Sequence, residues 1–415
     1  MNAVTLSILM LYVIYFWRKN VIRPDFIFTV SVLGSFFVAG LHLSLYQSYY
    51  KLEFYFLVYF LVFLFDAFYL LTRGRGNSIG RQGCQECDYG YGNAIKILVF
   101  GTSALMVSSV FVMWVVLGAP PAISMTNHRE LYWIPVIGNG YLLGTVCFSL
   151  LLFDRFTLRK ISNRNFFIGI SVVVVCTLLM ANKFQIFTLI LIYFFLKSLL
   201  SKSKSFLFFA GLCGCIVVIF AVMYEVFYTN MYNFSTQDAN YWYGVNLPEY
   251  LNFLVYPYLY IATNWDNLYN FMTSPIHHLF GAGIFFNITR SEFLSNIIFG
   301  DSILRYLVEY DDSLQIGKMN TATTFFLPYR DFGITGMCLY SIVIGMISGI
   351  VERYYKSNKS FFSLSLYLYV LVAVSFSFFN ENFTSKVLLI SLPVAYVCSL
   401  VLDRKIKIVM NKKYY

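Results

Sequence analysis

The sequence predicts an all-α polytopic membrane protein, on two grounds. Of its 415 residues, 59% are hydrophobic and only 12% are charged, whereas globular proteins carry about 25% charged residues. Long apolar runs recur along the chain, and a helix needs about 20 such residues to cross a bilayer. A chain of this composition cannot fold as a water-soluble domain, so its helices are expected to lie in lipid.

Eleven apolar runs are expected to be transmembrane helices. They cover residues 4–17, 26–45, 53–71, 97–117, 134–153, 165–181, 184–196, 206–227, 333–350, 361–379 and 385–402. Two weaker stretches, 251–262 and 276–298, interrupt a long polar segment. Because residues 251–262 are too few to span, an interfacial or re-entrant helix is expected there. If one or both stretches crossed, the count would be twelve or thirteen.

Basic residues define the orientation of these helices. Six short loops on one side hold 22 of the 30 Lys and Arg residues, and such an excess marks cytoplasmic loops. The amino terminus is therefore expected outside and the carboxyl terminus inside. These loops also explain the net charge of +10, so no nucleic-acid partner is expected. Basic residues follow the run 4–17 rather than precede it, the reverse of a signal peptide, so this helix is expected to remain uncleaved.

A change in composition divides the chain into three parts. Residues 1–227 hold the first eight predicted spans, residues 228–332 form one large outer loop with short helices, and residues 333–415 hold the last three spans. The loop has 12 Tyr, 2 Trp, nine acidic and four basic residues. Its rings could stack on sugars, although Tyr and Trp also collect at membrane interfaces. Because the loop is acidic overall, a phosphate site in it must be a local cluster of cations.

Four basic residues on the outer side are candidates for such a cluster. Arg290, Arg305 and Arg330 lie in the large loop, and a guanidinium donates two parallel hydrogen bonds to a phosphate. Lys183 lies at the outer mouth of a tight hairpin between the sixth and seventh runs. Each of these cations could instead pair with a neighbouring carboxylate or a lipid headgroup.

For other polar residues, the sequence favours structural roles. Asp66 lies in a predicted span near its inner end, where it could reach interfacial water or pair with Arg73. Cys84 and Cys87 form a lone C-x-x-C in a loop without further Cys or His, so two thiols are expected rather than a four-ligand zinc site. No P-loop, G-x-S-x-G or H-E-x-x-H motif occurs. No ATP-driven transport motor is therefore expected, and these motifs give no sign of a bound metal or cofactor.

The stretch 320–336, N-T-A-T-T-F-F-L-P-Y-R-D-F-G-I-T-G, resembles the end of the large outer loop in bacterial O-antigen polymerases. These Wzy-type polymerases of oligosaccharide repeat units are loosely marked by Asn and Thr, then Tyr, then D-F-G-x-x-G leading into a helix. The order of features is also similar: many spans, a tight hairpin with a cation, one large outer loop and a few closing helices. The likeness in layout covers most of the chain, whereas the motif covers 320–336 alone.

The resemblance implies a metal-independent membrane glycosyltransferase, with a fold like other multi-spanning (GT-C-like) transferases, in the bacterial inner membrane. Such an enzyme joins repeat units linked to undecaprenyl diphosphate into O-antigen or a similar surface polysaccharide on the periplasmic side. The implied partners are these lipid-linked oligosaccharides, membrane lipids, a chain-length regulator and a flippase.

The implied reaction also suggests roles for individual residues. Its diphosphate leaving group needs fixed cations, for which the candidates are Arg290, Arg305, Arg330 and Lys183. The residues that would bind and orient the sugars are Asn320, Thr321, Thr323 and Tyr329. Asp331 is the first candidate for the general base, followed by Glu309 and His278. Alternatively, Asp331 caps the helix that begins nearby or complements its dipole.

One departure separates this chain from the related O-antigen ligases. Those enzymes carry a His-Asn pair shortly before the comparable acid-x-Gly-x-x-Gly, and the residues here are A-T-T-F. This favours a polymerase, with a ligase as the first alternative. A lipid-linked oligosaccharide flippase or other transporter is the second, and a scaffold for polysaccharide export is the third. Transporters usually show paired halves, and the sequence shows none.

Overall fold

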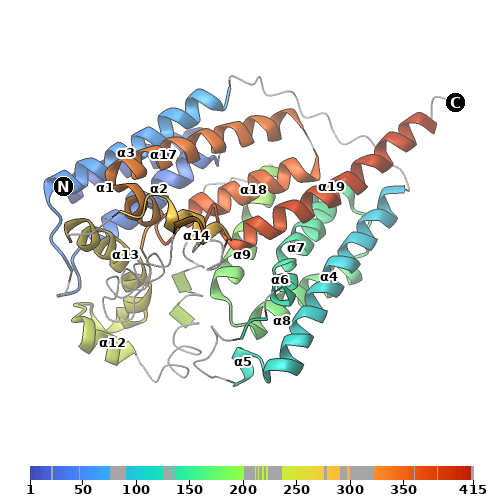
Figure 1. The fold of residues 1–415 in the computed structure, drawn as a ribbon, viewed down its shortest axis with the longest axis horizontal. Helices are drawn as coiled ribbons and strands as arrows, with labels where there is room; N and C mark the ends of the chain where they lie inside the picture. The colour runs from blue at the N-terminus through green and yellow to red at the C-terminus, as the bar shows by residue number, and fades with distance from the viewer. Residues whose placement is uncertain are drawn as a thin grey trace.

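A computed structural model describes most of the chain as α-helices (Figure 1). The described residues are 1–19, 22–45, 47–74, 90–124, 132–134, 136–200, 236–274, 278–289, 297–299, 322–358, 360–380 and 382–412, with six positions between 211 and 222. Within these ranges there is no strand, and one isolated antiparallel bridge joins Ser44 to Val245. The all-α prediction is confirmed for this part of the chain.

The helices follow one another in this order: α1 (Asn2–Lys19), α2 (Pro24–Ala39), α3 (Leu52–Thr72), α4 (Gly90–Leu117), α5 (Pro121–Ser124), α6 (Ile137–Leu142), α7 (Gly144–Phe153), the π-helix η2 (Asp154–Leu158), α8 (Asn163–Leu179), α9 (Lys183–Leu200), α12 (Thr236–Tyr243), the 3₁₀-helix η4 (Glu249–Leu254), α13 (Val255–Thr273), α14 (Ala282–Thr289), α17 (Phe326–Ser357), α18 (Phe361–Ser375) and α19 (Lys386–Lys412).

Helices coincide with ten of the eleven predicted apolar runs, and most of the run 206–227 lies outside the described residues. By length and composition, four segments of the described chain can cross a membrane: Leu52–Thr72, Asn93–Leu117, Ile137–Leu158 and Phe326–Ser357. Six shorter apolar helices of 10–17 residues accompany them. The chain therefore has several candidate membrane helices.

Local signals set several helix starts. α2 has Pro24 at its beginning, where the missing N–H would have no helical partner. Ser162 and Ser360 precede α8 and α18, and each side chain accepts a hydrogen bond from the backbone N–H three residues on. These are N-caps, which compensate for unpaired donors in the first turn.

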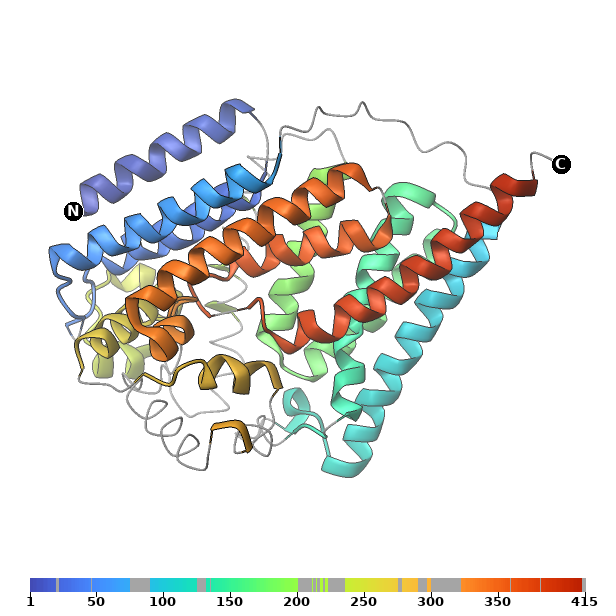
Figure 2. The same cartoon turned by 45° about the horizontal axis from the view of Figure 1, so that its top comes forward.

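α18 is the central helix of the bundle (Figure 1). It packs against α2 and α17 on one side and against α9 and α19 on the other, and nearly all of its residues are buried. α1 lies at the edge beside α2, and the two chain ends lie at opposite ends of the molecule (Figure 2). The fold thus joins two helical groups through α18.

α3 and α17 approach each other closely although they are far apart in sequence. A Cβ at Gly345 would lie 2.5 Å from the carbonyl oxygen of Phe65, and one at Gly349 would lie 2.6 Å from that of Tyr69. Small residues four apart allow membrane helices to pack backbone to backbone. Tyr69 then donates a hydrogen bond to Glu352. The sequence analysis did not anticipate this pair.

α13 crosses one end of the bundle, here called the α13 end. Trp265 packs on Phe36 at 4.8 Å between ring centroids, near the last turn of α2, and Phe271 packs on Phe326 at 4.8 Å, at the start of α17. The short helix expected over 251–262 is in fact a 3₁₀ turn followed by α13, which continues to Thr273. The prediction stopped too early because the polar residues after Ala262 are buried rather than exposed.

One of those polar residues, Asp266, fixes the segment between α2 and α3. Its carboxylate accepts hydrogen bonds from the Tyr50 hydroxyl at 2.8 Å, the Ser48 N–H at 3.3 Å and the Gln47 amide at 3.3 Å. Tyr258 donates to Gln47 and accepts from the Leu43 N–H at 2.8 Å. The α2–α3 segment is therefore bound tightly to α13.

Asp66 has partners other than those expected. Its carboxylate accepts hydrogen bonds from Tyr12 of α1 and from Thr29 of α2, the latter at 3.2 Å. The Arg73 guanidinium lies instead over the Tyr69 ring, 5.8 Å from its centroid. Because interhelical hydrogen bonds hold membrane helices together, Asp66 joins α1, α2 and α3.

Candidate functional site

The motif 320–336 and the residues before α14 meet at the start of α17, in a contact here called the α14 junction (residues 278–284 with 330–333). The backbone of Gly333 has φ 63° and ψ −152°, which interrupts α17. Such a break frees the carbonyl groups just before it from helical hydrogen bonds. Leu279 N–H donates to Arg330 O at 3.2 Å, and Phe280 N–H donates to Asp331 O at 2.9 Å. These bonds join two segments about fifty residues apart.

The Asp331 carboxylate holds the amino end of α14. One of its oxygens accepts from Gly283 N–H at 3.2 Å, and the other accepts from Ile284 N–H at 2.7 Å. Both donors belong to the first turn of α14, which has no helical acceptors for them, and a carboxylate there also complements the helix dipole. Asp331 is fully buried. It caps α14, a helix distant in sequence, and not the helix that begins beside it.

Arg330 lies against the same carboxylate. Its Nε is 3.8 Å from an oxygen of Asp331, and its guanidinium lies over the Phe326 ring, 5.7 Å from the centroid. Only 4% of Arg330 is exposed. A Cβ at Gly283 would lie 2.1 Å from an Arg330 nitrogen and 2.5 Å from an Asp331 oxygen, so glycine is required for α14 to approach this pair.

His278 joins the junction with a defined tautomer. Its Nδ1 lies 3.3 Å from the carbonyl oxygen of Arg330, and a carbonyl can only accept, so Nδ1 carries the hydrogen. In the neutral ring Nε2 is then the acceptor. A Cβ at Gly333 would lie 3.0 Å from that Nε2, so the break in α17 also leaves room for the imidazole. His278 is partly exposed, and its basic nitrogen faces the break.

Two further motif residues lie around the junction. The Tyr329 ring meets that of His278 edge to face at 5.6 Å, and its hydroxyl donates to Met272 O at 3.4 Å. Thr323 is buried, and its hydroxyl accepts from Phe325 N–H at 3.4 Å, so it closes the turn that leads into α17. Tyr329 contacts His278 directly, whereas Thr323 lies in the turn before α17.

Several predicted site residues lie outside the described residues. They are Arg290, Arg305, Glu309, Asn320 and Thr321. Their roles stay predictions, as does the C-x-x-C loop with Cys84 and Cys87. Lys183 begins α9 as the hairpin pattern suggested. In the described part of the chain, no three His, Cys, Asp or Glu residues are grouped to hold a metal ion.

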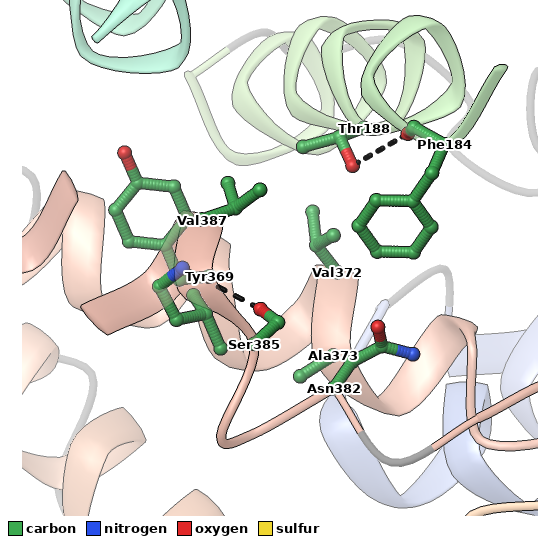
Figure 3. Close-up of a pocket in the computed structure, with 9 residues that line it drawn as sticks. Phe184, Thr188, Tyr369, Val372, Ala373, Asn382, Ser385 and Val387 are labelled. Carbon is green, nitrogen blue, oxygen red and sulfur yellow. Dashed lines mark hydrogen bonds between the residues drawn. The ribbon is translucent and has the colours of Figure 1, made fainter. Parts of the chain in front are cut away.

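A small cavity lies beside the start of α9, between α9, α18 and α19 (Figure 3). Its polar lining includes Thr188, which donates to Phe184 O at 2.9 Å, and Ser385, which accepts from Leu388 N–H at 3.4 Å. The remaining walls are mostly apolar, with Tyr369, Val372 and Ala373 among them. There is room for about one water molecule, so this cavity is not a sugar site.

No family model matches this chain, and no match was found among curated proteins or solved structures.

Sequence reasoning missed the two residues that shape the junction, Gly283 and Gly333. Gly333 had a signal, since D-F-G ends the polar stretch and a glycine there suggests an unusual backbone. Gly283 had none, because its importance depends on a guanidinium about fifty residues away. His278 was ranked last among the candidate bases, and the structure brings it together with Arg330, Asp331 and Tyr329.

Proposed function

We propose that this protein joins lipid-linked oligosaccharide repeat units into a surface polysaccharide, at the periplasmic face of the bacterial inner membrane. One observation carries the proposal: a partly exposed imidazole with a fixed tautomer stands where the apolar part of α17 begins. A reaction on a membrane-anchored sugar needs a proton acceptor at that level, and His is the commonest general base. The resemblance of residues 320–336 to repeat-unit polymerases supports the same reaction.

The chemistry assigns one role to each group. Nε2 of His278 takes the proton from the acceptor hydroxyl as that oxygen bonds to the anomeric carbon of the donor sugar. The bond between that carbon and the phosphate oxygen breaks, and its electron pair leaves with undecaprenyl diphosphate. Positive charge must stabilise the negative charge of the leaving group. Arg290, Arg305 and Lys183 are proposed to supply it. Arg330 is assigned a smaller share, because its charge already faces Asp331.

Asp331 acts in this proposal as a positioning residue. Its carboxylate is fully buried and occupied by two N–H donors, whereas a general base must come within hydrogen-bond reach of its proton. Through α14 and the Arg330 carbonyl it holds His278 beside Gly333. The geometry therefore favours His278 over Asp331 as the base.

Deletion and complementation test the function. Lipopolysaccharide from a deletion strain, separated on gels, should show core carrying a single repeat unit. Free lipid-linked polymer with uncapped core would mean a ligase, and an unchanged ladder would refute both. Reporter fusions at positions 205 and 240 should read cytoplasmic and periplasmic respectively if the proposed orientation is right.

His278→Asn tests the base. The asparagine amide can still donate to the Arg330 carbonyl, but it accepts no proton. Removal of a general base lowers rates by about 10²–10⁴-fold, so long chains should disappear while the membrane level of the protein is unchanged. Tyr250→Phe, on η4, is the matched control and should leave the ladder intact. A normal ladder from His278→Asn would exclude this histidine as the base.

A further inference from the structure

The turn between His278 and α14 carries an exposed aromatic ring on a strained backbone. Phe280 has φ 47° and is 78% exposed, and Gly281 follows with φ 94°. A bulky residue in the left-handed region is an outlier, and such strain persists only where the surroundings enforce it. Here the Leu279 and Phe280 N–H groups, both bonded to α17, hold the turn in place.

This turn lies on the first apolar residues of α17. A Cβ at Gly281 would lie 3.2 Å from the tip of the Phe332 ring, and Phe332 is itself 45% exposed. The exposed apolar face of α17 continues beyond the break through Leu339, Val343, Ile347 and Ile350. These four residues share one side of the helix, in a segment apolar enough to cross a membrane. The turn that carries Phe280 therefore stands beside Phe332, where the exposed apolar surface of α17 begins.

We propose that the turn 279–281 inserts Phe280 among the lipid chains, so that the α14 junction opens sideways into the membrane. In water, the exposed ring of Phe280 adds nothing to the two hydrogen bonds that hold the strained turn. In hydrocarbon the ring is desolvated, and phenylalanine is among the residues that favour the membrane interior. The turn is bonded to α17 immediately before the exposed apolar stretch of that helix. Lipid chains that surround this stretch would therefore also surround the turn.

The proposal defines the class of ligand that can reach His278. A ligand entering past Phe280 and Phe332 comes from the lipid leaflet with its polar head at the level of the imidazole. This part rests on the proposed function, because it takes His278 as the base and a lipid-linked sugar as the substrate. The insertion of Phe280 itself stands on the geometry of the turn.

Photocrosslinking in native membranes tests the insertion. The photoreactive residue p-benzoylphenylalanine replaces Phe280 in the full-length chain, and in a matched variant it replaces Tyr250 of η4, which is also 78% exposed. Mass spectrometry then identifies the adducts. Because a ring inserted among lipid chains has lipid as its main neighbour, lipid adducts at position 280 should clearly exceed those at position 250.

The adducts show whether lipid or protein surrounds position 280. Adducts at position 280 with phospholipid, or with a polyprenyl lipid, support the insertion. Equal lipid labelling at both positions, or protein adducts as the main product at 280, would overturn it. A second measurement uses Phe280→Trp and Tyr250→Trp in vesicles of brominated phosphatidylcholine: extra quenching relative to the parent chain should occur only for Phe280→Trp. A deletion strain with normal lipopolysaccharide would refute the proposed function and leave this result unaffected.

Discussion

Two Arg–Asp pairs stand at the starts of two long helices, and they differ in what they hold. Arg23 and Asp25 flank the first residue of α2, where Arg23 Nε donates to Asp25 at 3.0 Å. Arg330 and Asp331 lie in the first turns of α17, but Asp331 bonds to Gly283 and Ile284, 48 and 47 residues earlier in the chain. The Asp25 carboxylate bonds to a residue two positions away, whereas the Asp331 carboxylate joins distant segments.

Loss of Asp25 should affect the stability of the fold, whereas loss of Asp331 should also disturb the candidate site. Losing Asp25 removes a first-turn acid and the partner of one arginine, and Arg23 still lies over the Phe16 ring, 5.0 Å from its centroid. Losing Asp331 releases a helix, a buried guanidinium and the turn that carries His278. The two aspartates should therefore respond very differently to the same substitution.

The largest expected effect is that of Asp331→Ala. It leaves the buried Arg330 without this carboxylate and uncaps α14, and breaking a buried pair costs about 3–5 kcal/mol. Asp25→Ala should cost less, about 1–3 kcal/mol. Thermal unfolding in detergent measures both losses, and limited proteolysis reports whether residues 278–289 are released. Equal losses, with residues 278–289 still protected, would remove the distinction between the two pairs.

Asp266 extends the comparison to a carboxylate held mainly by side chains. Burial raises its pKa to about 6, although hydrogen bonds from Tyr50, Gln47 and Ser48 oppose the shift; α13 is not among the candidate spans. Because the folded pKa exceeds the unfolded value of 3.8, the folded state binds the proton more tightly. The protonated Asp266 carboxyl therefore stabilises the folded state fully below about pH 4. This contribution, up to about 3 kcal/mol, is lost as the pH rises through about 6.

Unfolding free energies between pH 4 and pH 7 measure this dependence. Asp266→Asn should flatten the part of the slope that Asp266 contributes, since the amide does not titrate in this range. A slope that is the same in both proteins would show that Asp266 does not control it.

A moderate effect is expected for Gly283→Ala at the α14 junction. The added methyl group would meet the Arg330 guanidinium at 2.1 Å, and forcing atoms into a packed site typically costs about 1–3 kcal/mol. Thermal unfolding should show that loss, and the polysaccharide ladder should shorten because α14 no longer seats correctly. Normal stability with a normal ladder would mean that this approach is not required.

The smallest effect is expected for Gly34→Ala in α2, the helix of the Arg23–Asp25 pair. Nothing lies within 4 Å of the added Cβ, and alanine is favoured over glycine inside a helix by about 0.5–1 kcal/mol. The variant should unfold at a slightly higher temperature with an unchanged ladder. A loss of stability would mean that a neighbour fills this space.

Features that depend on local contacts were predictable from the sequence, whereas features that depend on distant contacts were not. Helices such as α3 and α18 were predictable because continuous apolar runs with polar ends specify them residue by residue. Asp331 was recognised as a site residue or a cap from the D-F-G motif. Its true partner, α14, was not predictable, because no local pattern indicates which distant helix a carboxylate will meet.

Burial of polar residues explains the remaining errors. Asn264 and Asp266 follow the helix expected over 251–262, and both are buried, so α13 continues past them. Asp66 had Arg73 as a partner seven residues away in sequence, but its hydrogen bonds come from Tyr12 and Thr29 on two other helices. A sequence shows that a buried acid needs a donor, but tertiary packing decides which donor it finds.

The glycine-mediated approach of α3 and α17 has a consequence for how the chain matures in the bilayer. α3 is synthesised about 250 residues before α17. At about 5–20 residues per second, α3 waits for its partner helix for tens of seconds at the slower rate. Until then, the surface of α3 beside Phe65 and Tyr69 lacks the helix that packs on it, and the Tyr69 hydroxyl lacks Glu352. The amino-terminal half therefore completes its packing only after most of the protein has been synthesised.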